Sequence, residues 1–292
     1  MSANDNKRAL PASPPDVNVE NASGKGKGDE NFPVGSFLIR ANLRRHVHAF
    51  YNFARNADDI ADHPTLSPED KVARLNVMEA VLTGMQDTGA PSALALRTSL
   101  QETNVSDIHA RELLVAFRQD ATKTRYENWA ALLDYCRYSA APVGRYVLDL
   151  HGESRVTWPA SDALCAALQV NNHLQDVALD LRNLDRCYVP QDWLAQHHVS
   201  TDDIARGASV PGLRAVFDAM LVATDKLNEA GLALPGLVKA RRLRVETAVI
   251  ARLAICLTMK LKQHDALAMR VKLDKFDFIK AMMFASPRLL WN

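Results

Sequence analysis

The chain has 292 residues, of which 48% are hydrophobic, and its 35 lysines and arginines nearly balance 34 aspartates and glutamates. A net charge of +1 gives no overall attraction to nucleic acid, so we expect no nucleic-acid partner. The four cysteines form no CxxC pair, which argues against a disulfide framework or a structural zinc site and favours a reducing cytoplasm. No apolar run reaches the roughly 18 residues that a membrane span needs, so we expect a soluble or peripheral protein.

The N-terminal region differs in composition from the rest of the chain. Residues 1–30 are rich in proline, serine, asparagine, glycine and lysine. Such a segment cannot bury enough apolar surface to offset the entropy lost on ordering. We therefore predict a disordered tail over 1–30 and a single domain over 31–292.

From Phe32 onward, apolar residues recur at helical spacing, and the alternation of period two that marks strands is absent. This pattern predicts an all-α bundle with short connections. The predicted helices cover 36–63, 68–84, 91–102, 106–122, 127–150, 161–182, 211–231, 236–265 and 274–285.

The first predicted helix carries two neighbouring stripes. Its apolar stripe steps by four and three residues and consists of Leu43, Val47, Phe50, Ala54, Ala57 and Ala61. One position along, at the edge of that face, lies a polar stripe of Tyr51, Arg55, Asp58 and Asp62. The helix over 161–182 repeats the arrangement, with a polar stripe of Gln169, Asn172, Asp176 and Asp180.

Paired aspartates four residues apart repel each other and cost a helix roughly 0.2–0.5 kcal/mol. A divalent cation such as Mg²⁺ removes this repulsion, because it prefers carboxylate oxygens and completes its shell with substrate phosphates. Two such stripes facing each other across a bundle would hold metal and a diphosphate between them. On spacing alone, a solvated acidic face is an equal alternative.

Three segments resemble a known family. FYNFARNADDIAD (50–62) and NHLQDVALDLRNLDRCYVP (172–190) resemble the two aspartate motifs of the squalene/phytoene synthase family, and YCRYSAAPVG (135–144) resembles its central segment. The match runs from about Asn31 to the C-terminus in the expected order. The amino-acid sequences of all three segments are most similar to those of the hydroxysqualene synthase branch of bacterial hopanoid pathways.

This resemblance implies an all-α isoprenoid-synthase bundle with a central cavity, and it implies roles for particular residues. The Mg²⁺ ligands would be Asp58, Asp62, Asn172, Asp176 and Asp180. The residues that contact the diphosphate would be Arg55, Gln169 and Arg186. Tyr51 and Tyr138 would shape the cation, because aromatic faces stabilise positive charge. Outside the motif, Arg55 is explained as well by an ordinary ion pair with Asp58, and both tyrosines by core packing.

The implied reaction is Mg²⁺-dependent ionisation of presqualene diphosphate with capture of water, giving hydroxysqualene and diphosphate. It requires a paralogue that supplies presqualene diphosphate. The alternatives are a squalene or phytoene synthase that condenses two farnesyl or geranylgeranyl diphosphates, and a non-catalytic assembly factor. The last is disfavoured because the aspartates are present. Leu179 and Gln175 depart from the common motif and leave the product open.

The segment FIKAMMFASPRLLW (278–291) allows two interpretations. An apolar C-terminal helix could rest on a membrane surface, from which a lipid product could leave. Packing against the core explains its composition equally well.

Overall fold

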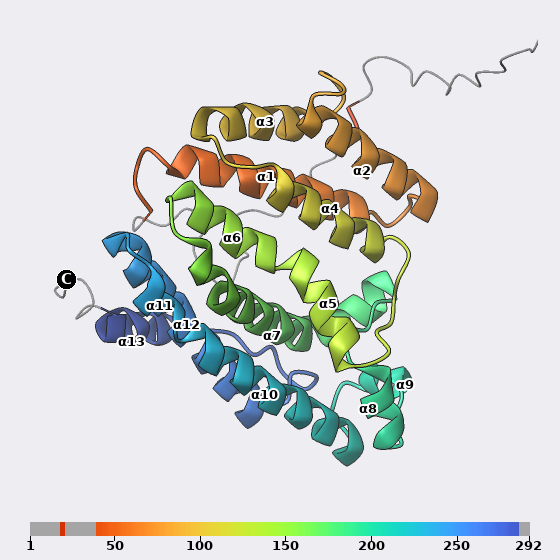
Figure 1. Cartoon of the computed structure of the whole chain (residues 1–292). Coiled ribbons are helices and arrows are strands. Elements are labelled where there is room, and N and C mark those ends of the chain that lie inside the picture. The colour runs from red at the N-terminus through yellow and green to blue at the C-terminus, as the bar shows by residue number, and fades with distance from the viewer. Residues whose placement is uncertain (1–17, 21–38, 286–292) are drawn as a thin grey trace, which may run out of the picture.

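The computed structural model describes residues 18–20 and 39–285, and this part of the chain folds as a bundle of helices (Figure 1). Within these ranges, the β-type pairing is limited to an isolated bridge between Arg125 and Cys187. The helices are α1 (Arg44–Ala61), α2 (Pro68–Thr83), α3 (Pro91–Thr103), α4 (Ile108–Asp120), α5 (Trp129–Ser139), α6 (Ala141–Leu150), the 3₁₀ turn η1 (Arg155–Thr157), α7 (Trp158–Leu184), α8 (Gln191–Gln196), α9 (Thr201–Ile204), α10 (Pro211–Gly231), α11 (Leu234–Leu237), α12 (Arg241–Gln263) and α13 (Lys275–Ala285).

The longest helix, α7, runs through the middle of the bundle (Figure 1). It packs against α5 and α6 and also against α10 and α12. A second group consists of α1 with α2, α3 and α4. Most of the first group surrounds one buried apolar cluster, and the second group surrounds another, to which α6 also contributes Tyr146 and Leu150. The two predicted polar stripes therefore belong to different helix groups, and they can act together only where these groups meet.

The helix that carries the first stripe begins later than predicted. The predicted helix covered 36–63, whereas residues 39–43 form turns and bends and α1 starts at Arg44. Its buried side includes Val47, Phe50, Ala57 and Ala61, as the apolar periodicity predicts, and also Phe53, which lies outside the predicted stripe. Asp62 caps the C-terminus, where its backbone N–H donates to the Asp58 carbonyl at 2.8 Å.

The predicted helix over 127–150 is in fact two helices. The backbone leaves helical geometry at Ala140, with φ −123° and ψ −47°, and Pro142 stands in the first turn of α6. Proline cannot donate a backbone hydrogen bond, so it is tolerated at a helix start but not in a helix interior. Gly144 then allows close packing of α6 on α7, because a Cβ there would lie 2.4 Å from Ser161 Oγ.

Part of the predicted disordered tail is ordered. The Val19 N–H donates to the Gly89 carbonyl at 2.9 Å, and the Arg74 guanidinium donates to the Val19 carbonyl at 3.2 Å. The Glu20 carboxylate accepts from the Ser92 backbone N–H and hydroxyl at 2.9 and 2.7 Å. Glu20 thereby caps the N-terminus of α3 from outside the helix. The tail prediction is wrong at residues 18–20, and its other residues lie outside the described part of the chain.

The last described helix, α13, is apolar on two faces. Phe278 and Met282 pack against a buried cluster with α12, whereas Phe276, Ile279, Met283 and Phe284 are exposed. Residues 286–291 of the predicted membrane-contacting segment lie outside the described ranges. None of the helices in the described ranges is both long and apolar enough to cross a membrane.

Candidate active site

The α1 stripe is arranged around Arg55. Its guanidinium lies 3.0 Å from a carboxylate oxygen of Asp58 and 3.0 Å from one of Asp59. Asp59 is buried, and Arg55 and Asp58 are half-buried. The ordinary ion pair that the sequence allowed is therefore present, on the same half-buried face as the motif aspartates.

Asp62, one turn further along, pairs with Arg186 at 2.5 Å. The Arg186 guanidinium also donates to the carbonyls of Ala61 and Asp120, at 3.0 and 3.1 Å. Only 5% of Arg186 is exposed, so these bonds replace most of its hydration. One arginine thus ties the end of α1 to the end of α4, beside the first aspartate motif.

The backbone after α7 brings Arg186 to this position. Asp185 ends α7 with a left-handed conformation, at φ 51°. The Arg186 N–H then donates back to the Asp180 carbonyl at 3.2 Å, and the Cys187 N–H donates to the Thr124 carbonyl at 2.9 Å. The Arg125 side chain binds the carbonyl and the carboxylate of Asp185. The turn that follows the second motif is therefore fastened to the segment after α4.

The predicted polar stripe of α7 lies along one half-buried edge of the helix, and its members are Gln169, Asn172, Asp176 and Asp180. The Gln169 side-chain nitrogen lies 3.2 Å from His173 Nε2. Gln175 serves another purpose, because its amide donates to the Val271 carbonyl at 2.7 Å and secures the segment that leads to α13. Leu179, the other departure from the motif, is exposed.

Electrostatics show that the two stripes converge. Burial, followed by the charges of Asp176 and Asp62, raises the pKa of Asp180 to about 7. Burial likewise raises the pKa of Asp58 to about 8, with Asp62 the next largest cause. Because Asp62 of α1 acts on Asp180 of α7, the carboxylates of the two motifs share one region of excess negative charge.

This excess charge fits a divalent cation, which would relieve the repulsion among the carboxylates. Within the described ranges, no group of three or more histidine, cysteine, aspartate or glutamate side chains is close enough to hold a metal ion by itself.

A buried polar cluster beside this region was missed by the sequence analysis. The Asp120 carboxylate accepts hydrogen bonds from the hydroxyls of Tyr135 and Tyr188, at 2.8 and 3.2 Å. Tyr188 stacks on His173 with ring centroids 3.6 Å apart. Tyr188 stands two residues after Arg186 in the chain, and this short separation from a predicted site residue was the only feature of the sequence that pointed to the cluster.

The two tyrosines predicted to shape the cation are both half-buried, Tyr51 on α1 and Tyr138 on α5. Tyr138 packs beside the larger buried cluster, and the Arg137 guanidinium lies 4.7 Å from its ring centroid. Their roles stay predictions.

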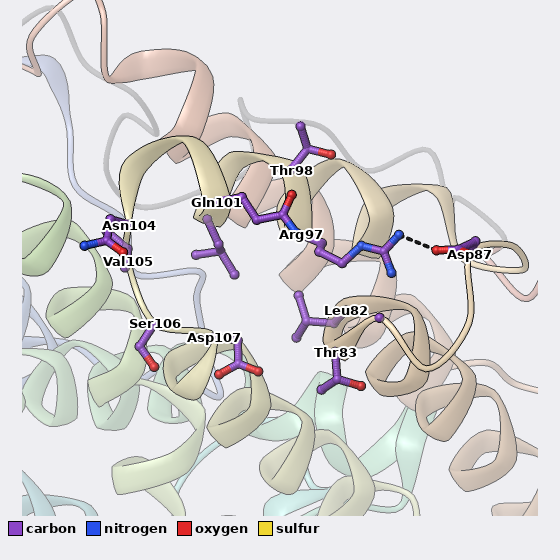
Figure 2. A pocket seen from close by; sticks show the side chains of 12 residues that line it. Leu82, Thr83, Asp87, Arg97, Thr98, Gln101, Asn104, Val105, Ser106 and Asp107 are labelled. Carbon is purple, nitrogen blue, oxygen red and sulfur yellow. Dashed lines mark hydrogen bonds and ion pairs between the residues drawn. The ribbon is translucent and has the colours of Figure 1, made fainter.

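A hollow of about 740 Å³ lies away from the aspartates, between the ends of α2 and α3 and the loop to α4 (Figure 2). Arg97 crosses one side of it and pairs with Asp87 at 2.6 Å. None of the predicted site residues lines it. The predicted central cavity is thus not this hollow, and it stays a prediction.

Comparison with known proteins decides the family. A family model described as squalene/phytoene synthase matches residues 25–277. The chain belongs to the squalene/phytoene synthase family. Members of this family act on isoprenoid diphosphates and generally use a divalent metal ion.

The hydroxysqualene synthase of Rhodopseudomonas palustris is 46% identical over 259 residues, which cover 89% of this chain and 88% of that protein. The hydroxysqualene synthase of Zymomonas mobilis is 46% identical over 273 residues, covering 92% and 91%. The phytoene synthase of Thermus thermophilus is 29% identical, covering 84% of each chain.

Solved structures confirm the predicted fold class. A squalene synthase from Alicyclobacillus acidocaldarius matches with a TM-score of 0.70 at 31% identity, covering 79% of this chain and 87% of that one. A dehydrosqualene synthase in complex with a ligand matches with a TM-score of 0.76 at 21% identity, covering 90% and 93%. The second likeness shows the fold alone. This chain therefore has the all-α isoprenoid-synthase fold.

Proposed function

We propose that this chain converts presqualene diphosphate and water into hydroxysqualene and diphosphate. The observation that carries the proposal is the 46% identity to hydroxysqualene synthases over about nine-tenths of the chain. The convergence of the two aspartate motifs supports it, because these carboxylates could hold the divalent cation whose positive charge a diphosphate leaving group needs. We further propose that residues 31–292 act as a single domain.

The metal in this proposal is Mg²⁺. When bound, it would stabilise the negative charge that develops on the departing diphosphate. The residues that would hold it are Asp58, Asp62, Asn172, Asp176 and Asp180. Carboxylate and amide oxygens are hard ligands that suit this ion.

The diphosphate itself would be bound by Arg55, Arg186 and Gln169. Arg186 is already oriented by two backbone carbonyls, so little side-chain freedom is lost when it binds an anion. Ionisation breaks the carbon–oxygen bond, and both bonding electrons leave with the diphosphate. No protein nucleophile is required.

The cation left behind would be shaped by Tyr51 and Tyr138, whose ring faces attract positive charge. Water then forms the new carbon–oxygen bond and loses a proton to the released diphosphate or to solvent. This balance requires one water and no reductant. A separate enzyme that makes presqualene diphosphate is the proposed functional partner.

We also propose that the exposed face of α13 contacts a membrane surface that contains anionic lipid. Phe276 and Met283 are 73% and 70% exposed on this face. Three lysines of the same segment are also exposed, namely Lys272, Lys275 and Lys280. Apolar side chains bordered by cations are typical of helices that lie in the lipid headgroup region.

The proposed function is tested by incubating the purified protein and Mg²⁺ with presqualene diphosphate and identifying the lipid by mass spectrometry. The expected product is hydroxysqualene, with one oxygen from ¹⁸O-labelled water. Presqualene diphosphate left unchanged would overturn the proposal. Conversion of farnesyl diphosphate to presqualene diphosphate, or to squalene when NADPH is added as the hydride donor, would instead support the condensing alternative, to which the 31% identical squalene synthase structure points.

A further inference from the structure

Asp120 is a buried carboxylate for which the proposed reaction has no use. It stands at the C-terminal end of α4 and is 7% exposed. Its two carboxylate oxygens accept hydrogen bonds from different elements, one from Tyr135 of α5 and one from Tyr188 after α7. Hydrogen bonds from two different elements fix the position of this buried carboxylate in the fold.

That place is beside Arg186. The Arg186 Nε donates to the backbone carbonyl of Asp120 at 3.1 Å. Burial opposes the charge of Arg186, but Asp120 and Asp62 raise the pKa of the guanidinium. The two carboxylates differ in exposure, since the Asp62 side chain is 27% exposed whereas Asp120 is enclosed. Asp120 is thus the counter-charge on the core side of Arg186.

The same cluster reaches a second residue of the proposed diphosphate site. Tyr188 donates to Asp120 and stacks on His173, whose ring lies 3.2 Å from the Gln169 amide. Displacement of the Asp120 carboxylate would therefore disturb Arg186 and Gln169 together.

We propose that Asp120 is a positioning residue whose carboxylate, held by Tyr135 and Tyr188, orients the Arg186 guanidinium toward the substrate diphosphate. The inference rests on the proposed function in assigning Arg186 to the diphosphate. Asp120 touches no reacting atom. Its effect passes through the arginine.

If Asp120 did not position Arg186, simple electrostatics would predict the opposite change in diphosphate affinity when its charge is removed. Removing a negative charge near an anion site should strengthen anion binding through reduced repulsion. Removing a positioning group should weaken it, because Arg186 loses its counter-charge on the core side and is drawn toward Asp62. The direction of the change in diphosphate affinity therefore separates the two accounts.

The experiment measures binding of inorganic diphosphate in the presence of Mg²⁺ by isothermal titration calorimetry, for the full-length chain and for Asp120→Asn. We expect the Kd to rise about tenfold in the variant, because the Arg186 guanidinium loses the neighbouring negative charge of Asp120 while its bond to the Asp120 backbone carbonyl remains. An unchanged or lower Kd in a folded variant would overturn the proposal. Because this assay involves no turnover, a wild-type protein that binds diphosphate without converting presqualene diphosphate would refute the proposed function alone.

Asp149→Asn is the matched control. Asp149 is largely enclosed and also contacts two side chains, His109 at 2.9 Å and Trp158 at 3.3 Å, outside the proposed site. It should lose stability but keep the wild-type Kd, whereas an equal rise in both variants would mean that general destabilisation explains the effect. If Asp120→Asn does not fold, Tyr188→Phe removes one hydroxyl and keeps the ring. A rise in its Kd supports the proposal, and an unchanged Kd contradicts it.

Discussion

Replacing Arg186 with methionine should destabilise the protein as well as impair its chemistry. The substitution removes a guanidinium that is 5% exposed and has three partners, the Asp62 carboxylate and the carbonyls of Ala61 and Asp120. Loss of one partner from a buried ion pair costs about 3–5 kcal/mol, because the remaining charge stays buried without compensation. At about 2 °C per kcal/mol for a chain of this size, Tm should fall by roughly 6–10 °C.

The assay is urea unfolding for the free energy and thermal unfolding for Tm, both followed by circular dichroism, with EDTA present so that metal cannot replace the lost cation. Arg206→Met is the control, because its side chain is 63% exposed and pairs with Asp203 at the surface. Such surface pairs contribute about 0–1 kcal/mol. If Arg186→Met lost no more stability than Arg206→Met, Arg186 would not be the buried tie between α1 and α4 described above.

Three further predictions concern pH, the N-terminal anchor and lipid. Burial raises the pKa values of Asp58 and Asp180 to about 8 and 7, so these folded carboxyls keep protons that the unfolded chain loses near pH 4. Without metal, their contribution to stability therefore falls as pH rises from about 4 to 8. The increase in Tm on adding Mg²⁺ should consequently be larger at pH 8 than at pH 6. Equal increases at the two pH values would contradict this. Glu20→Ala removes the cap on α3 and should lower the free energy of unfolding in urea by about 0.5–2 kcal/mol. An unchanged free energy of unfolding would mean that the contact is absent in solution. The double variant Phe276→Ser and Met283→Ser should co-sediment less with vesicles of mixed phosphatidylcholine and phosphatidylglycerol than wild type, and equal sedimentation would exclude this face of α13.

Much of the site's framework could be predicted from the spacing of residues within single helices. The α1 and α7 stripes lie where the helical period places them, since each depends on neighbours three or four residues away. The half-buried edge on which Asp58 and Asp180 stand also follows from their place beside an apolar face. Resemblance to the family then supplied what spacing could not, namely that the two stripes belong to one site.

The cluster around Asp120 could not be predicted in this way. Asp120 is a single acid at a helix end, and its partners Tyr135 and Tyr188 are 15 and 68 residues away in the chain. Only the packing of α4, α5 and the turn after α7 brings them together. The ordered contact of Glu20 with Ser92 was missed for the same reason, because composition reports the average behaviour of a segment and not one long-range hydrogen bond.

The central claim is that aspartates from α1 and α7 form one metal-dependent site for a diphosphate leaving group. Its most direct test is the rate of Mg²⁺-dependent diphosphate release from presqualene diphosphate by wild type, Asp58→Ala and Asp176→Ala, with helical circular dichroism as the folding control. The account predicts that both variants keep their helical signal and lose Mg²⁺-dependent release. Wild-type rates in both folded variants would contradict it.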